Sequence, residues 1–128
     1  MILFDTCTLL WLGADPAKLS AKAREIIESN SESLFVSSIS AFEIAIKHKR
    51  KRLAMPMDPA KWFVLALDHL GIHEIEVNAE IFAQSVSLPD LHHDPCDRVI
   101  AATAKLHGLT CLTPDALIRQ YPGVAVEW

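Results

Sequence analysis

Short apolar segments alternate with segments of helical periodicity along this chain, and this alternation limits the possible folds more than any other feature. We expect strands at residues 1–5, 34–37, 73–77, 109–113 and 124–127. Two of these are nearly all apolar, as expected for strands that are covered on both faces. Strands separated by helices of this length are typical of βαβ crossovers. The sequence therefore predicts an α/β fold with a parallel sheet and helices on both faces.

The segments between the expected strands carry helix-start and helix-end signals. The clearest is Asp94-Pro95, where a capping residue and a proline precede a helix that ends at Gly108. Other helices are expected over 6–13, from Ser20 to about residue 30, from Ser40 to about residue 50, over 58–70, and from Asn78 to about residue 86. No linker or repeat interrupts the pattern, so residues 1–128 are expected to form a single domain.

Composition limits the compartment and the class of partner. No apolar run approaches the roughly 20 residues of a membrane helix. The N-terminus lacks the basic region and cleavage pattern of a signal peptide, so we expect a cytoplasmic protein that does not bind a membrane. The net charge of −4 argues against a protein that coats nucleic acid by bulk charge. Residues 47–52, however, form one dense basic run.

The cysteines indicate neither a disulfide framework nor a strong zinc motif. Cys7, Cys96 and Cys111 are odd in number and scattered, and we expect reduced, mostly buried thiols. A zinc site built on His92, His93 and Cys96 would lack a second pair of ligands at suitable spacing.

Four acidic residues, Asp5, Glu43, Asp97 and Asp115, lie near the ends of expected strands or at the starts of the helices that follow them. In open parallel sheets, ligands bind outside the carboxyl ends of the strands. Two carboxylates about 5 Å apart repel by roughly 3 kcal/mol at an effective dielectric constant near 20. An empty cluster would therefore be destabilising or would have raised pKa values. Oxygen ligands of this kind favour Mg²⁺ or Mn²⁺.

Each of the four acids also has a purely local interpretation. Asp5 could cap the helix over 6–13, and Ser40-x-x-Glu43 fits a capping box. Asp97 would complement the dipole of its helix, and Asp115 could cap the last helix. Their common position at strand exits favours a metal site. A phosphotransferase nucleophile at Asp5 is disfavoured because the second acid of a D-x-D-x-T motif is missing.

Several other side chains have two open interpretations. Lys47 could neutralise a substrate phosphate or pair with Glu43 one helical turn earlier. His92 and His93 could contact a phosphate, transfer a proton or lie solvated in a loop. Trp11, Trp62 and Phe63 are expected in the core rather than under stacked bases. An acidic centre beside the basic run 47–52 suits a polyanionic substrate.

Four segments resemble, in order, the motifs of PIN-domain proteins, and most of all those of VapC-type toxins: residues 3–12, 37–47, 92–104 and 112–115. The resemblance implies a three-layer α/β/α fold with a central, mostly parallel sheet. It also implies Mg²⁺- or Mn²⁺-dependent endoribonuclease activity on RNA, a homodimer, and an inhibitory antitoxin whose tail fills the acidic groove. It assigns catalysis and metal binding to Asp5, Glu43, Asp97 and Asp115, with Asp94, Thr6, Thr113 and Lys47 as auxiliary residues. Cys96 departs from the pattern, because it stands where the family usually has an aromatic residue.

The resulting hypothesis is hydrolysis of RNA phosphodiester bonds by a water that the metal activates. Two alternatives stay open. One is a catalytically idle PIN-like binding module, and the other is a metal-dependent nuclease or phosphatase that acts on another phosphate substrate. The acids alone do not separate RNA from other phosphates, and only the resemblance points to RNA.

Overall fold

Five parallel strands form one sheet in the order β3-β2-β1-β4-β5. The structure, a computed structural model, describes residues 1–128. Every neighbouring pair of strands is parallel, which confirms the prediction from the strand and helix pattern. Each strand lies within the range expected for it: β1 (Ile2–Phe4), β2 (Leu34–Ser37), β3 (His73–Ile75), β4 (Thr110–Leu112) and β5 (Ala125–Glu127).

Helices connect the strands as the sequence predicts: α1 (Thr6–Ala14), α2 (Ala21–Ser29), α3 (Ile39–Lys49), α4 (Pro59–Leu70), α5 (Ala79–Ser87) and α6 (Pro95–His107). Two short 3-10 helices complete the chain, η1 (Pro16–Lys18) and η2 (Ile118–Gln120). In the segment 115–120, where Asp115 was considered as the cap of a last helix, the structure has only η2. None of the helices has both the length and the apolar character needed to cross a bilayer.

The predicted start of α3 at Ser40 is also wrong. The helix begins at Ile39, with Ser38 in the capping position but without a capping side-chain bond. The Ser37 hydroxyl accepts the backbone N–H of Ile39, and the Ser38 hydroxyl accepts that of Val77 on the neighbouring connection. The hydroxyls at the end of β2 thus satisfy these amides, and Ser40 falls inside the first turn.

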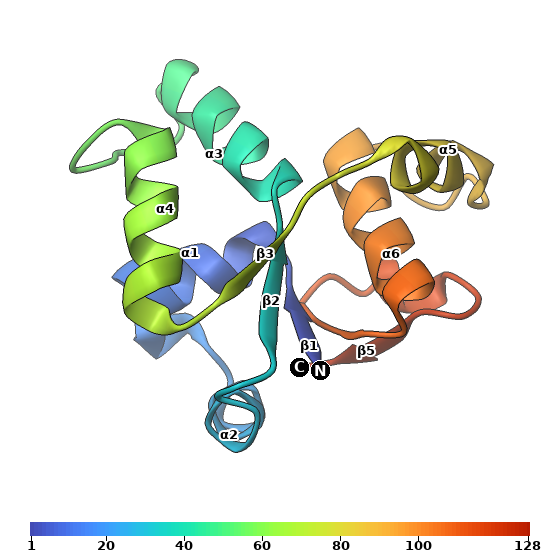
Figure 1. The fold of residues 1–128 in the computed structure, drawn as a ribbon, viewed down its shortest axis with the longest axis horizontal. Coiled ribbons are helices and arrows are strands. Elements are labelled where there is room, and N and C mark those ends of the chain that lie inside the picture. The colour runs from blue at the N-terminus through green and yellow to red at the C-terminus, as the bar shows by residue number, and fades with distance from the viewer.

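Figure 1 shows the sheet between two layers of helices, with α1, α2 and α4 on one face and α5 and α6 on the other. The alternation of side chains in β1 explains the layers. Ile2 and Phe4 pack with α1, α2, α3 and α4, whereas Leu3 packs with α5, α6 and η2. Phe63 is buried in the first of these cores, and Trp11 and Trp62 pack against it, which confirms their predicted core position.

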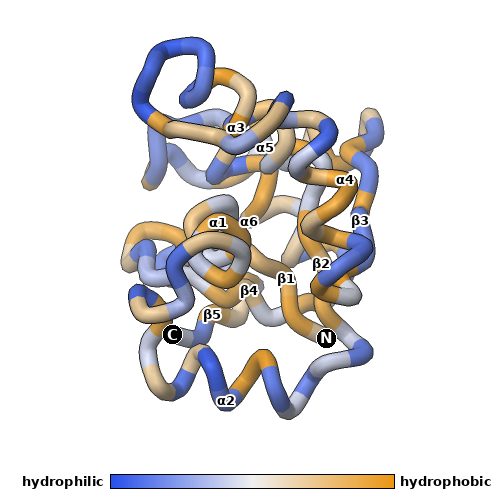
Figure 2. The backbone as a smooth tube through the Cα atoms, turned by 90° about the vertical axis from the view of Figure 1, so that its left-hand side faces the viewer, coloured by the Kyte–Doolittle hydropathy of each residue, from blue (hydrophilic) through white to orange (hydrophobic).

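The central strands are apolar and an edge strand is polar, as Figure 2 shows for β1 and β3. His73 and Glu74 of β3 are exposed, and charged or polar residues of this kind protect an edge strand from pairing with another chain. None of the three cysteines forms a disulfide. Two are buried and Cys7 is partly buried, as predicted.

Candidate metal centre

Asp5 follows β1 directly and has the capping role considered for it. Its Oδ1 accepts the backbone N–H of Thr8 at 2.8 Å and lies 2.6 Å from the Thr8 hydroxyl, so it caps α1. Its Oδ2 accepts a hydrogen bond from the Thr113 hydroxyl at the end of β4. The residue is only 5% exposed. Burial raises the pKa of Asp5, although the hydroxyls of Thr113 and Thr8 act in the opposite direction.

Glu43 points from α3 towards the same region. The Thr6 hydroxyl donates to its Oε1 at 2.7 Å and lies 2.9 Å from the Ser40 hydroxyl, which in turn donates to Thr6. Lys47 Nζ lies 3.1 Å from Oε2 of Glu43, so Lys47 forms the pair one helical turn apart that was one of its two open interpretations. Burial lowers the pKa of Lys47, but the Glu43 carboxylate outweighs it and the net shift is upward.

The capping box expected from Ser40 and Glu43 is wrong. Because α3 begins at Ile39, Glu43 lies beyond the first turn, where its side chain cannot reach back to the amide at the helix start. Both side chains contact Thr6 of α1 instead. A tertiary contact has replaced the local one.

The first turn of α6 supplies two further carboxylates. Asp94 caps the helix through Oδ1, which accepts the Cys96 N–H at 2.9 Å, and Asp97 follows in the same turn. One oxygen from each of Glu43, Asp94 and Asp97 lies within 4.8 Å of the others. Burial, followed by the charges of Asp94 and Glu43, raises the pKa of Asp97 to about 7. The sequence predicted such a rise for a cluster without a cation.

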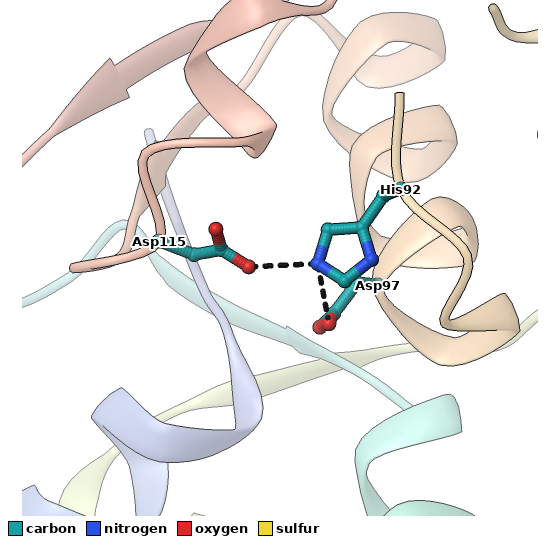
Figure 3. A group of neighbouring side chains, drawn as sticks. All are labelled: His92, Asp97 and Asp115. Carbon is teal, nitrogen blue, oxygen red and sulfur yellow. Dashed lines mark hydrogen bonds and ion pairs between the residues drawn. The ribbon is translucent and has the colours of Figure 1, made fainter. Parts of the chain in front are cut away.

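Asp115 and His92 form a second group that shares Asp97 (Figure 3). His92 Nε2 lies 2.9 Å from Oδ2 of Asp115 and 3.1 Å from Oδ2 of Asp97. Asp115 does not cap an α-helix; its Oδ1 accepts the N–H of Leu117 in a turn. His92 is not a solvated loop residue, because its side chain is only 14% exposed. His93, its neighbour, is exposed.

All four predicted acids line one cavity of about 310 Å³ at the carboxyl edge of the sheet, together with Thr6, Cys7, Lys47, Asp94 and Pro114. Thr113 lies buried behind it. Asp5 lines the cavity without belonging to either group of oxygens within 4.8 Å. A larger hollow of about 580 Å³ lies beside the cavity, but half of its lining is hydrophobic and Asp90 is its only acid. The smaller cavity is therefore the candidate centre.

The donors in the cavity suit a hard divalent cation. Carboxylate oxygens outnumber the single adjacent ammonium group, and burial together with the charges of Asp94 and Glu43 raises the pKa of Asp97. The nearby thiols are not in the thiolate form that binds softer metals. Burial raises the pKa of Cys7 to about 11 and that of Cys96 to about 12, which keeps both protonated at neutral pH. The zinc site considered from His92, His93 and Cys96 is not supported, because neither His93 nor Cys96 belongs to a group of side chains that could hold a metal ion.

Three residues with clear roles at the site were missed by the sequence prediction: Thr8, Ser40 and Arg98. Thr8 could have been found, since it is three residues after the capping Asp5. Arg98 donates to the carbonyls of Leu88 at 2.7 Å and Pro89 at 2.9 Å, and so ties the loop before α6 to that helix. Its only sequence signal is an arginine that opens an otherwise apolar helical run.

Comparisons with known proteins agree with this architecture. The model of the PIN domain family matches residues 2–124. Ribonuclease VapC22 of Mycobacterium tuberculosis (strain ATCC 25618 / H37Rv) is 31% identical over 130 residues, which cover 99% of this chain and 98% of the relative.

Solved structures share the fold at lower identity. A chain in the crystal structure of VapBC2 from Rickettsia felis, bound to a DNA fragment from their promoter, has a TM-score of 0.73 at 15% identity. The match covers 99% of this chain and 98% of that one. A chain of a toxin–antitoxin complex from Klebsiella pneumoniae has a TM-score of 0.66 at 24% identity, covering 98% and 96%. These likenesses confirm the predicted α/β/α fold.

Proposed function

This chain belongs to the PIN domain family and is of the VapC type, and on that premise we propose that it is a Mg²⁺- or Mn²⁺-dependent endoribonuclease, the toxin of a toxin–antitoxin pair. The observation that carries the proposal is the convergence of acids on one cavity, where Asp97 has a pKa of about 7. A divalent cation would remove this repulsion. The name of the ribonuclease relative supports RNA as the substrate.

Glu43, Asp94 and Asp97 would hold the ion, and Asp5 and Asp115 line the same cavity. When bound, the ion supplies an activated water and stabilises the negative charge of the transition state. The hydroxyls of Thr6, Thr8 and Thr113 fix the acids in place through the bonds described above. A carboxylate without a capping role is then available to orient the attacking water and to accept its proton.

The basic run predicted to suit a polyanion lies beside the acids. Lys47, Arg50 and Arg52 line a hollow of about 300 Å³ that also includes Glu43 and Asp94. A phosphate backbone that crosses this hollow would meet positive charge on one side and the cation on the other. We therefore place the path of the RNA along the C-terminal half of α3.

Cleavage of labelled total RNA tests the proposal. We expect discrete fragments with Mg²⁺ or Mn²⁺, none with EDTA, and a severe loss of activity in Asp5→Asn and Asp97→Asn. Asp68→Asn is the matched control, because Asp68 is exposed on α4 outside the cavity. Undiminished cleavage by Asp97→Asn, or cleavage in EDTA, would contradict the proposed mechanism.

The same preparation separates the two alternatives. An idle binding module would show no cleavage and no increase in melting temperature with metal, whereas a metal site must stabilise the fold by mass action. A metal-dependent enzyme with another substrate would show the metal-induced stabilisation but would cleave DNA or a phosphate monoester in place of RNA.

We propose a cognate antitoxin and a second copy of the chain as protein partners. The chain exposes two separate apolar surfaces that could serve them. Phe42, Phe82 and Val86 are 57%, 50% and 80% exposed on α3 and α5, and Val64 and Leu65 are 63% and 50% exposed on α4. Light scattering with Phe82→Glu and Val64→Glu, with and without the antitoxin, would assign each surface; no effect of either would contradict this use of them.

A further inference from the structure

His92 lies between Asp97, a proposed metal ligand, and Asp115, which lines the same cavity, and its position allows two roles. It comes from the loop between α5 and α6, and in Figure 3 its Nε2 faces both Asp97 and Asp115. A nitrogen and two carboxylates at this spacing have the composition of a mixed metal site. A ring that donates a hydrogen bond to both carboxylates would have the same geometry. The hydrogen bond of the other ring nitrogen, Nδ1, distinguishes a metal ligand from a hydrogen-bond donor.

Nδ1 of His92 accepts the backbone N–H of Asp94 at 3.1 Å. A backbone amide always carries its hydrogen, so Nδ1 must present a lone pair. In this pattern the proton of the ring is on Nε2, and Nε2 is a donor that points at the carboxylates. A protonated nitrogen cannot ligate a metal. Ligation through Nε2 would move the proton to Nδ1, where it would face the Asp94 N–H.

Helix α6 holds this arrangement from two directions. Asp94 caps the helix through its side chain, which fixes the amide that contacts the ring. Arg98 donates to the His92 carbonyl at 3.3 Å and to the carbonyls of Leu88 and Pro89. Both the ring and the backbone of His92 are thus tied to the first turn of α6, so its orientation is set before any ion binds.

A hydrogen-bond donor at His92 would match the donors that the other acids of the site already have. Asp5 has Thr8 and Thr113 as donors, and Glu43 has Thr6. Asp97 and Asp115 come from separate elements and repel each other, and among the bonds that hold them His92 alone contacts both. Carboxylates that bind a metal are commonly oriented by such hydrogen bonds.

We infer that His92 is a positioning residue that holds Asp97 and Asp115 through a fixed Nε2–H, and that it is not itself a ligand of the ion. This inference rests on the proposed function. It predicts that the Nε2 proton persists when the metal binds, and that a side chain which can donate a hydrogen bond replaces His92 better than an apolar ring.

Three variants and one spectrum test the inference. In His92→Phe, Mn²⁺ affinity measured by electron paramagnetic resonance should fall about 10- to 100-fold. His92→Gln keeps an N–H donor and should retain most of the affinity, and His93→Gln, at the exposed neighbouring position, should retain all of it. In ¹⁵N spectra of the wild type, Nε2 of His92 should be protonated both without metal and with saturating Mg²⁺.

The outcomes separate the inference from the function on which it rests. Loss of the Nε2 proton on Mg²⁺ binding would make His92 a ligand and overturn the inference, as would wild-type Mn²⁺ affinity in His92→Phe. Failure of the wild type to bind Mn²⁺ at all would instead refute the proposed function. Unfolding in EDTA checks that His92→Phe is folded, and the spectrum of the wild type does not depend on that variant.

Discussion

Asp97→Asn is expected to stabilise the metal-free protein, because it removes a charge that the fold holds at a cost. The ordinary pKa of this carboxyl is 3.8, and burial with the charges of Asp94 and Glu43 raises it to about 7 in the folded chain. The folded state therefore keeps a proton that the unfolded state releases. The stability from this group is fully present below pH 3.8 and is lost as the pH rises to about 7.

The size of the effect follows from that shift. A rise of about 3 pH units corresponds to about 4 kcal/mol as an upper limit. The Asp97 side chain is 18% exposed, so solvent screening reduces this value. The lost interaction of the carboxylate with the dipole of α6 offsets another 0.3–1 kcal/mol or so. We expect a net stabilisation of about 2 kcal/mol at pH 8 and less than about 1 kcal/mol at pH 5, since pH 5 lies little more than a third of the way between the two pKa values.

Urea unfolding in EDTA at both pH values measures this difference, with Asp68→Asn as the control for loss of an exposed acid. Saturating Mg²⁺ or Mn²⁺ should reverse its sign, because an ion at 100 times its Kd stabilises the wild type by about 2.7 kcal/mol and the variant by less. A variant that is less stable than the wild type in EDTA at pH 8, or equally shifted at pH 5, would refute the raised pKa of Asp97, and with it the cost of holding this charge in the fold.

Three further substitutions test the scaffold around the centre. Thr113→Val removes the donor to buried Asp5 and should cost about 1–3 kcal/mol in urea unfolding, whereas Thr113→Ser should not. Arg98→Lys cannot reach several carbonyls at once, so amide hydrogen exchange should accelerate over residues 86–92; unchanged exchange would contradict this. Gly108→Ala places a Cβ at φ 63° and should cost about 1 kcal/mol in unfolding with unchanged Mn²⁺ affinity.

The sequence predicted the sheet and the gathering of the acids at its carboxyl edge because both depend on regular geometry. Parallel strands end at one edge, so acids that follow β1 and β4 must lie near each other, and Asp5 and Asp115 line one cavity. A helix signal such as Asp94-Pro95 is local and needs no tertiary context. These features could be predicted before any contact between distant residues was known.

Predictions failed or stayed open where a contact between distant elements decides the outcome. Ser40 and Glu43 fit a capping box in the sequence, but the hydroxyl of Thr6 on another helix binds both. The role of His92 depends on a loop conformation that Arg98 fixes through hydrogen bonds to backbone carbonyls. Every residue has a carbonyl, so residue types do not indicate which ones Arg98 contacts. Residue type and spacing alone could not determine either arrangement.

Helix capping and metal binding by the same acids do not exclude each other, because both follow from the geometry of the sheet. In a parallel α/β sheet, the helix that follows each strand begins at the carboxyl edge, where ligands bind. A carboxylate that caps such a helix therefore already lies at the site. Asp5 caps α1 and Asp94 caps α6, and both line the acidic cavity. A good capping signal on an acid at this edge thus does not argue against a metal site. In Asp94, one carboxylate oxygen satisfies the helix and the other is available to the cavity; in Asp5, the second oxygen also accepts the Thr113 hydroxyl and keeps one further lone pair.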